Sequence, residues 1–179
     1  MNKLFFFIFF SFIVLAQNTF NEYGKREGVW TGYHPNGVMK YQGSFVAGQE
    51  VGVFNYYNYA GSLVIRLDYI EPGVKSYAFT YRNNGLVQSE GAYVNKEKNN
   101  LWIYYYENNT ILSKANYLEG ILHGDFVSYH NNGIKSEIYF YQHGKKSGEG
   151  YVFYPSGNLN IECNYFNDQL HGEAKFYYN

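Results

Sequence analysis

The chain has 179 residues and a formal net charge of −1, from 14 Lys and Arg against 15 Asp and Glu. This near neutrality, with no basic block longer than the two lysines at 145–146, argues against a nucleic-acid partner. Tyr and Phe contribute 22 and 15 residues and Gly 19, whereas Pro contributes only 3, a mixture typical of strands joined by tight turns.

Residues 1–16 have the pattern of an export signal. Lys3 precedes an apolar run from Leu4 to Ala16, which is shorter than the about 20 residues that a membrane-spanning helix needs. A positive residue, an apolar run and a small residue together indicate a signal peptide cleaved after Ala16. We therefore expect export to the periplasm, the cell surface or the medium, with an uncleaved anchor as the alternative. Residues 17–22 are expected to form a short linker.

Residues 23–179 repeat with a period of 24. The letters LHG occur at 122–124 and return 48 residues later, and half of this spacing places units near residues 28, 52, 76, 100, 124 and 148, with a half unit from 172. Because glycine accepts positive φ, two series of glycines on this period are predicted to mark turns. They are Gly28, Gly52, Gly124, Gly148 and Gly172, and Gly37, Gly61, Gly85, Gly133 and Gly157. Ser76 and Asn100 interrupt the first series, and local irregularity is expected there.

Aromatic residues occupy two further columns of the repeat. Every member of both columns is aromatic, although aromatics make up only 22% of the chain, so the pattern indicates an array of structural repeats. One column is Tyr33, Tyr57, Tyr81, Tyr105, Tyr129, Phe153 and Tyr177, and the other is Phe45, Tyr69, Tyr93, Tyr117, Tyr141 and Tyr165.

Each unit is predicted to be a β-hairpin. In the first, strands over about 29–34 and 38–46 flank a turn with the letters PNG at 35–37. The other connection is predicted to be a loop of about six residues, as at 119–124 and 167–172. Apolar and polar residues alternate along the second strands, as in half-buried antiparallel strands. The expected fold is therefore all-β: an elongated single-layer antiparallel meander of six hairpins plus a closing strand, with open edges near 29–34 and 173–178.

Three segments resemble MORN repeats, and more closely the bacterial variant found in YwqK-type antitoxin components. They are YHPNGVMKYQGSF at 33–45, YRNNGLVQSEGAY at 81–93 and YHNNGIKSEIYFYQHGKKSG at 129–148. The resemblance implies a twisted sheet of stacked hairpins that serves protein contacts and, in some relatives, contacts with membrane lipid.

Candidate chemical groups are scattered along the array. His123 and His171 lie two units apart, about 19 Å by strand spacing, so they are not expected to share a metal ion. His34 and His130 flank the hairpin turns and are expected to be solvated. Cys163, the single cysteine, is expected to be a small strand residue. Since a one-layer sheet gathers no catalytic pocket, neither an enzyme nor a cofactor or metal site is expected.

The two aromatic columns are the candidate binding surface. Their main expected role is to stabilise the sheet, but exposed rings also suit contacts with other molecules. The predicted function is a non-catalytic exported scaffold that binds an unknown protein, through an aromatic face or an open edge strand. The alternatives are an antitoxin-like or immunity-like neutraliser of a toxic partner, and a binder of glycan or membrane lipid.

Overall fold

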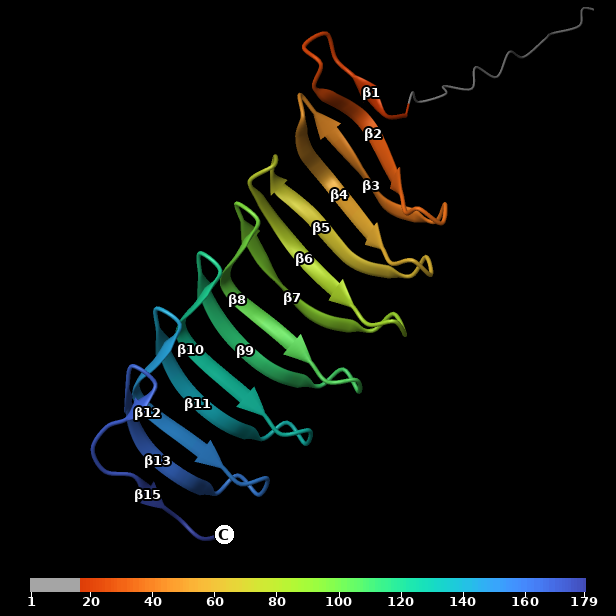
Figure 1. Ribbon diagram of the computed structural model, residues 1–179. Coiled ribbons are helices and arrows are strands. Elements are labelled where there is room, and N and C mark those ends of the chain that lie inside the picture. Colours follow the sequence, from red (N-terminus) through yellow and green to blue (C-terminus); the bar gives the residue numbers. More distant parts are fainter. Residues whose placement is uncertain (1–16) are drawn as a thin grey trace, which may run out of the picture.

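The computed structural model describes residues 17–179 as one continuous antiparallel sheet (Figure 1). The predicted signal segment, residues 1–16, lies outside the described residues. Within residues 17–179, no helix is long and apolar enough to cross a membrane. The strands are β1 (Thr19–Phe20), β2 (Arg26–Tyr33), β3 (Met39–Val46), β4 (Gln49–Tyr57), β5 (Leu63–Glu71), β6 (Lys75–Tyr81), β7 (Val87–Val94), β8 (Glu97–Tyr105), β9 (Ile111–Leu118), β10 (Ile121–Tyr129), β11 (Lys135–Gln142), β12 (Lys145–Phe153), β13 (Leu159–Phe166), β14 (Gln169–Leu170) and β15 (Lys175–Phe176).

Each strand from β1 to β13 pairs with the next one along the chain, and β15 also pairs with β13. The hairpins follow one another along a ribbon, and no part of residues 17–179 forms a second layer over either broad side (Figure 1). The predicted all-β, single-layer antiparallel meander is confirmed.

The connections at one end of the strands are the predicted tight turns. In the first hairpin, the amide of Gly37 donates to the carbonyl of His34 over 2.9 Å, and the amide of His34 donates to the carbonyl of Val38 over 2.8 Å. Gly37 has a φ of 82°, which a glycine adopts without steric cost. Glycine or asparagine recurs at this turn position in the later hairpins, with φ between 64° and 92°.

The connections at the other end are shorter than predicted. β9 ends at Leu118 and β10 begins at Ile121, so only Glu119 and Gly120 join them, where a loop of about six residues was expected. Both have positive φ, 50° and 77°, which is the geometry of a type I′ turn. Ala47–Gly48, Asn95–Lys96 and His143–Gly144 likewise have positive φ at both residues. The prediction of a six-residue loop was therefore wrong, because the last residues of the predicted loop belong to the next strand.

The first glycine series was also misassigned. Gly52 has a φ of 64° but lies inside β4, where the register against β3 shifts. Gly124 likewise lies inside β10, at a register shift against β9. These glycines belong to β-bulges within strands and not to turns. In a β-bulge one strand has an extra, unpaired residue, and a glycine with positive φ often occupies it. Asn100 keeps the bulge with a φ of 59°, since asparagine tolerates this conformation.

The third unit has no such bulge. Ser76 pairs with Tyr69 in β5 and with Tyr93 in β7, in regular register on both sides. The irregularity expected around Ser76 lies instead at Ile70, next to the Pro72–Val74 turn between β5 and β6.

Both ends of the sheet differ from the prediction. Residues 17–22, expected to be a linker, include β1, which pairs with β2, so 29–34 is not the edge strand. The side chain of Asn18 explains this extension, because it bonds the amide and the carbonyl of Thr31. At the other end, the closing strand expected at 173–178 is reduced to the two residues of β15.

The two sides of the sheet carry different side chains. We call one side the Trp30 face; it carries Trp30, Phe54, Trp102 and Phe126 together with the column that begins at Phe45. The other side, the Tyr33 face, carries the column that begins at Tyr33. The largest fully buried side chains of the described residues, Phe54 and Trp102, lie on the Trp30 face.

Large and small residues alternate across the junctions between hairpins on the Trp30 face. Their packing is complementary, because a large side chain covers a small residue on the neighbouring strand. The opposed pairs are Leu67 with Ala78, Gly91 with Trp102, Ala115 with Phe126, and Tyr139 with Gly150.

Candidate functional site

Cationic side chains lie over the rings of the Trp30 face. The guanidinium of Arg26 is 4.7 Å from the ring centre of Trp30, and the ammonium of Lys146 is 3.4 Å from that of Tyr139. Arg26, Lys98 and Lys146 occupy the same position in different repeats, since they are separated by multiples of 24 residues. None of them takes part in an ion pair among residues 17–179.

Lys98 sits in the most complete of these clusters. Its ammonium lies 4.5 Å from the ring centre of Trp102, 5.1 Å from that of Tyr104 and 5.2 Å from that of Tyr117. It also donates to the hydroxyl of Tyr104 over 2.7 Å, and this hydroxyl is 2.9 Å from that of Tyr117. Burial and the contact with Tyr104 raise the pKa of Tyr117 to about 12. The site is therefore a cation held over three neutral rings.

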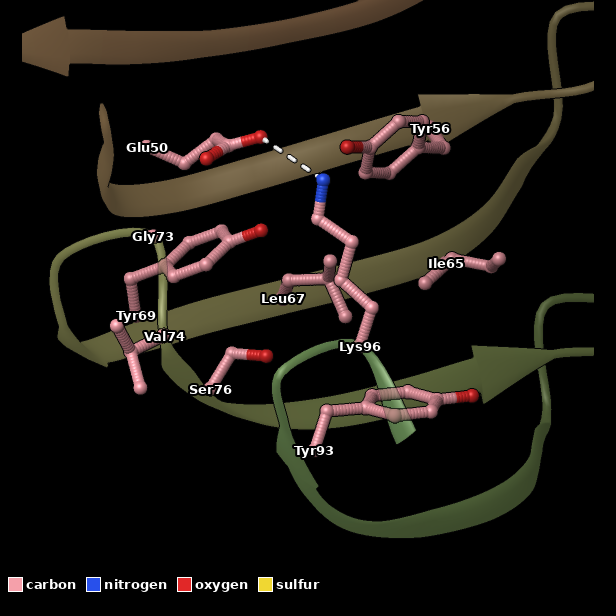
Figure 2. A pocket seen from close by; sticks show the side chains of 10 residues that line it. All are labelled: Glu50, Tyr56, Ile65, Leu67, Tyr69, Gly73, Val74, Ser76, Tyr93 and Lys96. Carbon is pink, nitrogen blue, oxygen red and sulfur yellow. Dashed lines mark ion pairs between the residues drawn. The ribbon is translucent and has the colours of Figure 1, made fainter. Parts of the chain in front are cut away.

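A hollow of about 290 Å³, which we call the Glu50 hollow, opens on the same face two units earlier (Figure 2). It lies beside the unit in which Ala78 takes the repeat position of Phe54 and Trp102, so a ring is missing from the row. Its lining comes from four strands and two turns: Glu50, Tyr56, Ile65, Leu67, Tyr69, Gly73, Val74, Ser76, Tyr93 and Lys96.

One carboxylate lies in the wall of this largely apolar hollow. The side chain of Glu50 is 21% exposed, and its Oε1 is 3.9 Å from Nζ of Lys96, whose side chain is 77% exposed. Figure 2 shows Lys96 pointing from its turn toward Glu50. Burial and then the charge of Glu50 raise the pKa of Tyr69 to about 12 and also raise that of Tyr56. Both phenols are thus neutral hydrogen-bonding groups at neutral pH.

The Tyr33 column lies on the opposite side of the sheet. The hydroxyl of Tyr105 donates to Glu90 over 2.5 Å, whereas Gly91, the next residue of β7, faces Trp102. The two ends of the column are exposed, 60% for Tyr33 and 38% for Tyr177, and the members between them are half-buried. In the other column Phe45 is buried and the five tyrosines are half-buried.

Side-chain hydrogen bonds connect each hairpin turn to the next, and we call this series the ladder. It was not predicted from the sequence. His34, Arg82, Tyr106, His130 and Tyr154 each bond the backbone carbonyl 23 residues ahead, over 2.6–2.9 Å. The two histidines were expected to be solvated, and this was wrong. The signal was present, because every one of these residues stands at one repeat position and has a side chain able to donate a hydrogen bond.

The remaining polar residues form no reactive cluster. No group of three or more His, Cys, Asp and Glu that could hold a metal ion occurs in the described part of the chain. His123 and His143, from adjacent units, bring their ring centres to 5.4 Å, a pair that was not expected. Glu162 accepts from Tyr177 and Lys175, and Cys163 is 5% exposed within β13.

Comparison with known families agrees with this architecture. The MORN repeat variant model matches residues 26–47, 98–119 and 146–167. These matches begin a whole number of 24-residue periods apart, and each covers one hairpin, complete in the first and lacking only the first strand residue in the other two. These three segments of the chain are MORN repeats of this variant. MORN repeats are generally non-catalytic and commonly serve as scaffolds for contacts with proteins or membranes.

No curated protein matches the chain. Among solved structures, it is similar to an S. aureus TarM mutant in complex with fondaparinux, α-GlcNAc-glycerol and UDP, at 11% identity and a TM-score of 0.40 over 54% of this chain and 19% of that chain. It is also similar to a second TarM crystal structure, at 13% identity and a TM-score of 0.38 over 50% of this chain and 18% of that one. The chain thus spans less than a fifth of the length of either structure.

Proposed function

We propose that this protein is an exported, non-catalytic scaffold that binds another protein through its Trp30 face. The observation that carries the proposal is a row of rings and unpaired cations along one uncovered side of the sheet, from Arg26 on β2 to Lys146 on β12. Aromatic residues and arginine are the side chains most enriched at the energetic centres of protein interfaces.

The chemistry of this face favours an extended acidic partner. Arg26, Lys98 and Lys146 present positive charge, and the rings beneath them present apolar area. A partner segment that alternates carboxylates with aliphatic or aromatic side chains would meet both groups. The C-terminal edge offers a second route by strand addition, because Phe166, Leu170 and Phe176 around the short closing strands are 62%, 63% and 67% exposed.

A capture experiment with matched variants tests this function. Immobilised 17–179 is exposed to cell-envelope extract beside two triple variants, one for each face, both shown to be folded by circular dichroism. The Trp30-face variant changes Tyr69, Tyr117 and Tyr141 to Ser, and the Tyr33-face variant changes Tyr81, Tyr105 and Tyr129 to Ser. A protein retained by the parent and the Tyr33-face variant, but lost from the Trp30-face variant, is the expected result. Equal retention by all three would overturn the assignment of the face.

Export is tested separately. Expression of the full chain should yield a mature protein that begins at Gln17 and fractionates outside the cytoplasm, because the pattern of residues 1–16 is that of a cleaved signal. Mass spectrometry of the intact protein measures the cleavage site. Recovery of only the uncleaved chain in the cytoplasmic fraction would contradict this part of the proposal.

A further inference from the structure

The repeat provides an internal comparison for the Glu50 hollow. Shifting the Lys98 cluster back by two periods of 24 residues places Glu50 at the position of Lys98, while an aromatic ring occupies each ring position. The corresponding rings are Phe54 for Trp102, Tyr56 for Tyr104 and Tyr69 for Tyr117. The charge at this repeat position is therefore positive in the Lys98 cluster and negative in the Glu50 hollow.

Two ring-to-ring contacts have similar distances at both places. The ring centres of Phe54 and Tyr56 are 6.4 Å apart, as are those of Trp102 and Tyr104. The edge-to-face contact between Phe45 and Phe54, at 5.2 Å, corresponds to that between Tyr93 and Trp102, at 5.0 Å. The sheet therefore repeats the arrangement of Phe54 and Tyr56 in Trp102 and Tyr104, once with a carboxylate and once with a cation at the charged position.

The ammonium group of Lys96 indicates the kind of group that the Glu50 hollow can accept. It stands at a turn position where Gly48, Gly120 and Gly144 are found in other units, and its φ of 68° is one that a lysine rarely adopts. From this position its side chain reaches Glu50, but the nitrogen stays 3.9 Å from the nearest oxygen and the side chain remains 77% exposed. An exposed ion pair at this distance contributes little, so an outside ligand can displace it.

We propose that the Glu50 hollow binds an alkylammonium group of another molecule, and that Lys96 occupies the site in the free protein. Glu50 supplies the counter-charge, Tyr56 and Tyr69 supply ring faces, and Ile65 and Leu67 cover the alkyl chain. The volume of about 290 Å³ is near the lower limit of small-ligand pockets, which suits the end of a lysine side chain or a small free amine. The site does not depend on the protein partner proposed above.

Calorimetric titration with simple probes tests the chemistry. The probes are n-butylammonium, butyltrimethylammonium, a lysine residue capped at both ends, and uncharged 1-butanol. Binding of the cations without binding of 1-butanol is the expected result, because Glu50 and the rings attract charge. Tighter binding of butyltrimethylammonium assigns the site to free quaternary amines, whereas tighter binding of capped lysine assigns it to a lysine of a partner. Equal binding of 1-butanol would overturn the proposal.

Three variants place the binding in the hollow. Glu50→Gln should weaken cation binding by about tenfold or more, the loss expected when a partly buried counter-charge is removed. Lys96→Gly, which restores the residue of the other turns, should strengthen it by about two- to fivefold because the internal competitor is gone. Glu97→Gln, an exposed charge change beside the same turn, is the control and should leave affinity within about twofold. No heat of binding with the Lys96→Gly variant, or no effect of Glu50→Gln, would refute the proposal.

Discussion

Gly91 on β7 lies directly opposite Trp102 on β8, and a Cβ atom on Gly91 would approach Cδ2 of the indole to 2.5 Å. The side chain of Trp102 is completely buried by this contact and by its neighbours. Its Nε1 also donates to the carbonyl of Ala92 over 3.0 Å, which fixes the ring over the glycine. The indole of Trp102 can therefore occupy this position only because Gly91 has no side chain.

We expect Gly91→Ala to lower the free energy of unfolding by about 1–3 kcal/mol, because the added methyl group forces the indole out of a well-packed site. Urea unfolding followed by Trp fluorescence and circular dichroism measures the change. The control is the pair Gly91→Leu and Trp102→Ala, which copies the opposed residues Leu67 and Ala78 of the preceding junction. The double variant should be more stable than the sum of the single effects predicts; simple additivity would contradict complementary packing.

The regular part of this fold could be predicted from the sequence. The 24-residue period, the glycine or asparagine at the hairpin turns, and the two aromatic columns each follow from local rules that a single strand or turn obeys. The single-layer meander then follows, because consecutive hairpins with one period must stack in order. For these features, local preference and global arrangement agree.

The bulges and the Glu50 hollow could not be predicted, for two physical reasons. A glycine such as Gly52 has positive φ both in a turn and in a bulge, so its period alone does not distinguish the two structures. The hollow lies beside Ala78, where other units have a ring, and its wall includes the Lys96 side chain, which reaches Glu50 from a different turn. Such tertiary features leave no periodic trace in the sequence.

The ladder between turns gives a second prediction. The hydroxyl of Tyr106 donates to the carbonyl of Tyr129 over 2.8 Å, so Tyr106→Phe should lower the free energy of unfolding by about 1 kcal/mol. Chemical denaturation measures the loss, and Tyr178→Phe, at a side chain that is 97% exposed, is the control. Tyr154→Phe should cost less, because its acceptor Tyr177 lies beyond the short closing strand β15. An unchanged midpoint for Tyr106→Phe would show that the ladder does not stabilise the stack.

The half-buried tyrosines lead to a prediction about the stability of the sheet at alkaline pH. Burial is the main cause that raises the pKa values of Tyr69, Tyr105 and Tyr117 from 10.0 to about 12. Because the folded state holds these protons more tightly than the unfolded state does, their contribution to stability is complete below pH 10 and is lost as the pH rises from 10 to about 12. Urea midpoints measured across this range should fall steadily. A constant midpoint up to pH 12 would contradict the raised pKa values.

At Tyr105 the effect of burial on the pKa can be separated from the effect of a neighbouring charge. After burial, its hydrogen bond to Glu90 and the charge of that carboxylate raise its pKa. Glu90→Gln removes the charge but leaves the burial, so the pKa of Tyr105 should fall part of the way toward 10.0. The Cζ chemical shift of labelled tyrosine, followed as a function of pH, gives the value for this residue. Tyr117, on the opposite face, is the internal control and should titrate as before.

Cys163 lies near the C-terminal end of the stack. Its side chain is 5% exposed, and its sulfur lies 3.6 Å from the carbonyl of Gly150 on β12. Its strand, β13, is flanked on the outer side only by the short strands β14 and β15. A thiol reagent should therefore react with Cys163 at least about a hundredfold more slowly than with a cysteine introduced by Lys145→Cys in a Cys163→Ser background, since the buried thiol reacts only after local opening.

Removal of residues 169–179 should speed the labelling of Cys163, because β13 then becomes the edge strand and opens more often. The Lys145→Cys thiol should react at the same rate with and without the truncation, because Lys145 is already exposed at the start of β12. Equal labelling rates for Cys163 in the two lengths of chain would show that β14 and β15 do not protect the edge. In that case the packing of Cys163 against β12 alone would account for its slow reaction.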